Sequence, residues 1–128
     1  MKITLFTKNS LRHNYFINYL SSFVDELYVI QENIAIKPDK IQGRYNISPT
    51  MNKYFKAVNS AETKLFSGFN NNNKNIKIFS LPFGKVNNFE FHSILNFFRS
   101  DLYIIFGSSY IKRKDLVDFL VKKKAINI

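Results

Sequence analysis

Apolar residues follow two different periods along this chain, and together the periods predict five strands that alternate with helices. Alternating or continuous apolar runs of strand length occupy 2–7, 26–31, 76–80, 102–106 and 124–127. Apolar residues recur at helical spacing in 11–23, 49–68, 91–100 and 112–124. Ser48 followed by Pro49 matches an N-cap with Pro at the first helical position, so we expect the second helix to begin there. Residues 33–48 show neither period, so we expect a long loop there. The tract from Asn70 to Asn73 is a low-complexity loop to which we assign no packing role.

This alternation predicts one α/β domain over residues 1–128, with a parallel sheet covered by helices on both faces. The expected arrangement is a Rossmann-like, three-layer fold whose five strands lie in the order 3-2-1-4-5. In such sheets ligands bind beyond the carboxyl ends of the strands. The candidate functional residues are therefore those that directly follow each strand.

Composition narrows the chemistry that these residues can support. The chain has no Cys, which excludes disulfide scaffolds, thiolate metal sites and cysteine nucleophiles. With only two His and no ligand-spaced pair, we expect no metal site. Its 19 basic and 9 acidic residues give a net charge of +10, which suits an anionic partner. The alternative is that this charge is a compositional effect, since Lys, Asn, Ile and Phe are all abundant.

The sequence does not predict a membrane protein. No apolar stretch reaches the roughly 20 residues of a membrane span. The first residues carry only a five-residue apolar run between Lys2 and Lys8, unlike a signal peptide. We therefore expect a cytoplasmic protein with no membrane partner, and we do not expect it to bind nucleic acid.

The turn after the first strand is a candidate anion site, because it combines helix N-terminal amides with cations and hydroxyl or amide donors. It lacks the glycine pattern of a dinucleotide site and the lysine motif of a P-loop. An ordinary capped turn with solvated charges is the alternative. The candidate residues are Asn9, Ser10, Arg12 and His13.

Residues that follow the second and fourth strands are further candidates. Glu32 follows the second strand, where it could hold a ribose or an amine, although a solvent-facing carboxylate is the favoured interpretation. After the fourth strand, Gly107 would let a flat ligand approach the backbone, or would instead serve close helix-on-strand packing.

Four segments of the chain carry a family resemblance, and the first and last are the most specific. The segments are MKITLFTKNSLRHNYFINYL from Met1, ELYVIQE from Glu26, MNKYFKAVNSAETKLF from Met51 and DLYIIFGSSYIKRKDLVDFLVKKKAINI from Asp101. They resemble the folate-dependent formyltransferases, and most closely the N-terminal domain of the bacterial sugar-nucleotide and methionyl-tRNA types.

The resemblance implies a cofactor, 10-formyltetrahydrofolate, and a substrate, the amine of an anionic small molecule such as a nucleotide-linked amino sugar. By resemblance, the cofactor-binding residues are Gly107, Ser109, Tyr110 and Ile111, and the substrate-binding residues are Asn9, Ser10, Arg12 and His13. Asn127 matches the family's catalytic Asn, which a His follows two residues later and an Asp much further on.

The sequence ends at Ile128, one residue before that His. We therefore expect a truncated or fragmentary formyltransferase fold that transfers no formyl group by itself, and whose bare fifth strand favours dimerisation. The alternatives are a basic phosphate- or nucleotide-binding module without catalysis, and a decayed remnant without a ligand.

Overall fold

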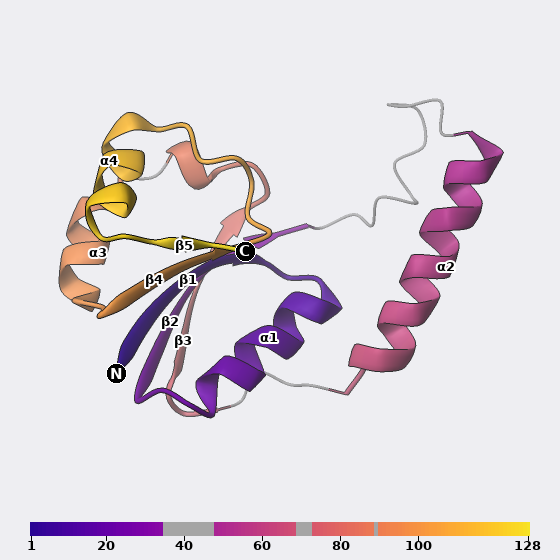
Figure 1. Cartoon of the computed structure of the whole chain (residues 1–128), viewed down its shortest axis with the longest axis horizontal. Helices are drawn as coiled ribbons and strands as arrows, with labels where there is room; N and C mark the ends of the chain where they lie inside the picture. Colours follow the sequence, from indigo (N-terminus) through magenta and orange to yellow (C-terminus); the bar gives the residue numbers. More distant parts are fainter. Residues whose placement is uncertain (35–47, 69–72, 89) are drawn as a thin grey trace.

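The computed structural model describes residues 1–34, 48–68, 73–88 and 90–128, and within these it shows the predicted parallel sheet (Figure 1). The strands lie in the order β3-β2-β1-β4-β5, and every neighbouring pair is parallel, which confirms the predicted fold class. The strands are β1 (Lys2–Lys8), β2 (Glu26–Asn33), β3 (Ile76–Pro82), β4 (Leu102–Phe106) and β5 (Ile126–Asn127). The α-helices are α1 (Leu11–Ser21), α2 (Pro49–Phe66), α3 (His92–Phe98) and α4 (Lys114–Lys122), and a short 3-10 helix, η2, covers Val86–Asn88.

Helices cover both faces of the sheet, so the protein has three layers (Figure 1). Side chains of successive strand residues point to opposite faces, and this separates two apolar clusters. On the face covered by α1, Ile17 packs with Leu5 and Val29. On the face covered by α3 and α4, Phe98 and Leu120 pack with the sheet. Because all neighbouring strands are parallel, their carboxyl ends lie at one edge of the sheet.

Helix α2 has a different environment from the other helices. Ser48 and Pro49 begin it as expected, since the Ser48 hydroxyl accepts a hydrogen bond from the amide of Met51 at 3.2 Å. None of its described residues is buried. Its contacts with α1 include the rings of Tyr15 and Phe66, 5.2 Å apart. In Figure 1 it stands beyond α1, away from the sheet.

The predicted boundaries are close to those observed, with differences at the ends of elements. The fifth strand begins at Ile126 rather than at residue 124, because Lys124 has a φ of 52° and turns the backbone. The second strand continues to Asn33, beyond the predicted end at residue 31, because Glu32 pairs with both β1 and β3 and Asn33 pairs with β3. Asn73, from the tract with no assigned role, donates a hydrogen bond from its amide to the Ser21 hydroxyl at 2.7 Å.

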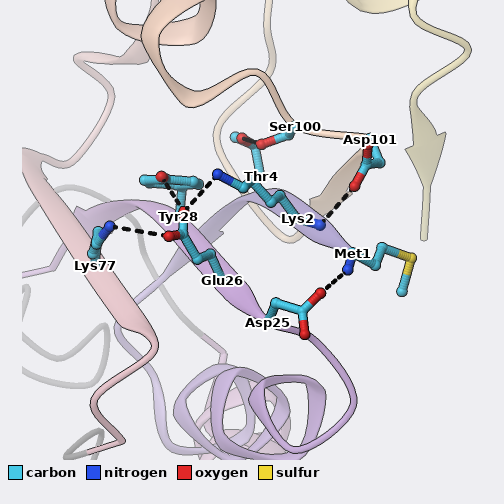
Figure 2. Close-up of polar contacts among 9 residues, drawn as sticks. All are labelled: Met1, Lys2, Thr4, Asp25, Glu26, Tyr28, Lys77, Ser100 and Asp101. Carbon is cyan, nitrogen blue, oxygen red and sulfur yellow. Dashed lines mark hydrogen bonds and ion pairs between the residues drawn. The ribbon is translucent and has the colours of Figure 1, made fainter.

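Charged side chains gather where the strands begin, at the amino edge of the sheet (Figure 2). The Glu26 carboxylate receives a hydrogen bond from the Tyr28 hydroxyl and pairs with the ammonium groups of Lys2 at 3.3 Å and Lys77 at 3.7 Å. This hydrogen bond and the ion pair with Lys2 hold the pKa of Glu26 below its usual value. Nearby, the amino group of Met1 pairs with Asp25.

Candidate functional site

An open cavity of about 450 Å³ lies at the carboxyl edge of the sheet, between the end of β4 and β5. It is formed largely by the segment that follows β4, and the parallel pairing of β4 with β5 places Asn127 opposite Ile105. All four predicted cofactor-binding residues and the predicted catalytic Asn line this one cavity. The lining residues are Ile105, Gly107, Ser108, Ser109, Tyr110, Ile111, Asn127 and Ile128.

A smaller apolar groove of about 190 Å³ shares Ile105 and Ile111 with the cavity. Its remaining lining residues come from α4 and the turn that follows it: Val117, Leu120, Val121 and Ala125. The cavity therefore has a wall of backbone and small polar groups that leads into an apolar recess. This combination suits a ligand that carries both a polar ring and an apolar extension.

Close packing against His13 requires a glycine at position 107. Its φ of 69° lies in the left-handed region, and a Cβ atom built on it would come within 2.2 Å of the Nε2 atom of His13. The imidazole of His13 also lies against the Phe106 ring, with the ring centroids 4.8 Å apart. Of the two interpretations of this glycine, the structure supports close packing between α1 and the end of β4.

His13 is a buried packing residue, only 2% exposed. Its Nδ1 atom is hydrogen-bonded to the hydroxyl of Ser10. Burial, together with the smaller effects of the nearby charges of Arg12 and Lys8, lowers the pKa of His13 from 6.5 to about 4. The ring is therefore neutral at neutral pH, and it serves as a wedge between α1 and Gly107.

The other predicted substrate-binding residues are divided between internal contacts and the surface. The side-chain oxygen of Asn9 accepts a hydrogen bond from the Ile34 amide at 2.9 Å. The Ser10 hydroxyl, at the N-cap position of α1, bonds to the His13 ring and to no backbone amide. Arg12 is exposed and pairs with Glu62 of α2 at 3.6 Å. None of the four lines the cavity, so their substrate role stays a prediction.

The structure corrects the sequence interpretation of Glu32, which favoured a carboxylate facing solvent. The residue is completely buried. One carboxylate oxygen accepts hydrogen bonds from the amides of Gly84 at 2.9 Å and Val86 at 3.3 Å, and the other accepts from the Ser109 amide at 2.6 Å. Glu32 is buried because β2 still pairs with both β1 and β3 at this residue, so Glu32 lies inside the sheet. The loops after β3 and β4 then fold over its side chain.

Asn87 is a second residue of the site that sequence reasoning missed. Its side-chain amide donates to the Tyr110 carbonyl at 2.8 Å, and its side-chain oxygen accepts from the amides of Lys112 at 2.7 Å and Arg113 at 3.1 Å. It thus connects η2 to the segment after the cavity. Nothing in the local pattern of the polar loop around it distinguishes Asn87 from Asn88.

Two buried hydroxyl groups have no hydrogen-bond partner within the part of the chain that the structure describes: Oγ1 of Thr7 and Oγ of Ser109. A buried hydroxyl without a partner is unfavourable, so each is a candidate contact for a bound molecule. Ser109 lines the cavity, whereas Thr7 does not.

Lysines lie at the ends of three strands at this edge: Lys8 is the last residue of β1, Lys85 follows β3 and Lys112 follows β4. The ammonium group of Lys8 lies 5.1 Å from the centre of the Phe83 ring. Cations at this edge of the sheet favour a ligand that carries negative charge.

Within the described residues, no group of three His, Asp or Glu side chains is placed to hold a metal ion. The helices described here include none with both the length and the apolar character needed to cross a membrane.

Comparisons of the chain with protein-family models, with curated proteins and with solved structures find no match. The functional argument therefore depends on the geometry of the carboxyl edge.

Proposed function

We propose that this protein binds a reduced folate, 10-formyltetrahydrofolate, at the carboxyl edge of the sheet, as a formyltransferase-like protein. One observation carries the proposal. The residues that resemble the folate-binding segment of formyltransferases, together with Asn127, line a single cavity at the edge where parallel sheets bind ligands.

The cavity fits the size and chemistry of such a ligand. Its volume of about 450 Å³ lies within the range of about 300–1,000 Å³ that small-molecule sites occupy. The polar pterin ring would lie against the small polar groups of 107–109, where the Ser109 hydroxyl lacks a protein partner. The apolar groove beyond Ile111 would accommodate an aromatic extension. The lysines at this edge of the sheet suit the ligand's carboxylates.

When bound, 10-formyltetrahydrofolate supplies a formyl group for transfer to an amine. The amide of Asn127 can donate a hydrogen bond toward a carbonyl oxygen in the cavity, which is the role its resemblance implies. Transfer also requires a group that accepts the proton of the attacking amine. None of the described residues that line the cavity has an imidazole, carboxylate or lysine side chain. We therefore propose binding of the folate without formyl transfer by these residues alone.

The two unpartnered hydroxyls provide a matched test of this proposal. Ser109→Ala removes the unpartnered hydroxyl of a residue that lines the cavity, and Thr7→Val removes that of a residue that does not. Because each change deletes a buried group without a partner, both variants should be as stable as the wild type or slightly more stable. Only Ser109→Ala should weaken binding, by about 3–10-fold, the loss expected for one neutral hydrogen bond.

Binding is measured by calorimetric titration with 5-formyltetrahydrofolate, a stable analogue, and with a nucleoside diphosphate as the second ligand. Affinity for the folate that falls in Ser109→Ala and persists in Thr7→Val supports the proposal. Binding of the nucleotide alone would replace it with the basic nucleotide-binding alternative. If neither ligand binds at millimolar concentration, both functions are rejected.

A further inference from the structure

We infer that Glu32 is the positioning residue of the cavity: its buried carboxylate holds the loops after β3 and β4 in the shape that creates the site. Glu32 itself does not line the cavity, and it acts through the loops that it holds. It rests on the proposed function only for the identity of the ligand.

The contacts of Glu32 connect three parts of the fold. The residue lies in the sheet between β1 and β3, paired with Lys8 and Leu81. From there its two carboxylate oxygens accept three backbone amides, two from the loop after β3 and one, that of Ser109, from the cavity wall. A carboxylate has enough acceptor sites for all three bonds, whereas no uncharged side chain of this size has two equivalent acceptor atoms.

The carboxylate also fixes the direction of the cavity wall. A backbone amide that donates to Glu32 points into the protein, so the Ser109 peptide cannot rotate without breaking a charge-assisted hydrogen bond of 2.6 Å. The flanking residues support the same shape from either side. Gly107 is held against His13, and the Tyr110 carbonyl is held by Asn87. Three successive anchors therefore fix the segment 107–110.

Hydrogen exchange of the wild-type protein tests whether Glu32 holds these loops, without any ligand or variant. If Glu32 holds the wall, the amides of Gly84, Val86 and Ser109 should exchange as slowly as those of the inner strands, although they lie in loops. Ser109 exchange at the rate of an open loop would overturn the inference.

Variants separate positioning from general stability. Glu32→Gln keeps the size of the side chain but replaces one acceptor oxygen with a donor, so one loop must lose its bond. Exchange at Ser109 and affinity for 5-formyltetrahydrofolate should each change by about tenfold or more, as expected for a hydrogen bond to a charged group. Glu32→Asp keeps the charge but shortens the reach, and we expect it to lose the same contacts.

Glu26→Gln is the matched control, because it makes the same change on the same strand at the opposite edge of the sheet. It should leave folate affinity and Ser109 exchange unchanged. If Glu32→Gln accelerates exchange equally in the loops and in the inner strands, or leaves affinity equal to that of Glu26→Gln, Glu32 contributes stability only and the inference is wrong. Failure of the wild type to bind folate would reject the proposed function but not the exchange result.

Discussion

The two ends of β2 carry the same side chain in opposite environments. At the amino edge, Glu26 is partly exposed and is held by the Tyr28 hydroxyl and by two lysine ammonium groups. At the carboxyl edge, Glu32 is completely buried and is held by three backbone amides. Strand periodicity places both side chains on the same face of the sheet, because they are separated by an even number of residues.

What differs is the chain that covers them. At the amino edge the carboxylate meets long, flexible side chains in contact with water, where ion pairs add little to stability. At the carboxyl edge two loops fold over the carboxylate and direct their amides at it, and the same loops build the cavity. The comparison indicates that rigid backbone positioning is concentrated at the edge where a ligand would bind.

The largest effect should come from Gly107→Ala. The added Cβ would meet the buried His13 ring, and alanine would also occupy a left-handed conformation. The two penalties together should lower the free energy of unfolding by about 2–4 kcal/mol. Gly84→Ala is the control, since its φ is also positive, at 78°, and nothing lies within 4 Å of the added Cβ.

Urea denaturation of both variants measures this difference. Gly84→Ala should lose only about 1 kcal/mol, the conformational part of the penalty. In addition, His13→Ala combined with Gly107→Ala should be less destabilised than the sum of the single variants, because the clash is removed. An equal loss of unfolding free energy in Gly84→Ala and Gly107→Ala would show that the contact with His13 does not restrict position 107 to glycine.

The second effect concerns pH. The pKa of His13 is lowered to about 4 in the folded protein from 6.5, so between these values the unfolded chain binds more protons. Stability from this group is complete above pH 6.5 and is lost as the pH falls toward 4. Between pH 7 and pH 5 the free energy of unfolding should fall by about 2 kcal/mol.

Urea denaturation at several pH values checks this loss. His13→Leu should remove most of the pH dependence in that range. Glu26→Gln should keep it, because the pKa of Glu26 is lowered from its ordinary value of 4.5 and its contribution is lost only at lower pH. A wild-type protein whose stability is flat between pH 7 and pH 5 would contradict the buried position of His13.

The smallest effect should come from Tyr28→Phe at the amino edge. The variant loses the hydrogen bond to Glu26 but keeps the ring stacked on Phe98, with centroids 4.1 Å apart. We expect the melting temperature to fall by about 1–3 °C at low salt, and by less at high salt. A loss as large as that of Gly107→Ala would remove the contrast between the two edges.

The fold was predictable because the information for it is local. The apolar runs of the inner strands and the helical spacing between them identify each element, and alternation of the elements implies a parallel sheet. Ser48 and Pro49 likewise predicted the start of α2 from adjacent residues alone. The ends of elements were less accurate, as at Lys124, because a single positive φ at a non-glycine residue has no sequence signal.

The site was only partly predictable. Gly107 and its neighbours were identified because they follow a strand of the predicted sheet. Glu32 was misassigned, because its burial depends on loops that are 50 to 80 positions away in the chain, including the amide of Ser109. His13 could not be recognised as a buried wedge for the same reason: the residue that it packs against, Gly107, is remote in sequence.

The most direct test of the central claim is an NMR titration of the wild-type protein with 5-formyltetrahydrofolate, following backbone amides at both edges of the sheet. We predict saturable shifts at Gly107, Tyr110 and Ile111, with none at Lys2 or Glu26. The absence of shifts at 107–111 at millimolar ligand, or shifts of equal size at the amino edge, would contradict the assignment of the carboxyl edge as a folate-binding site.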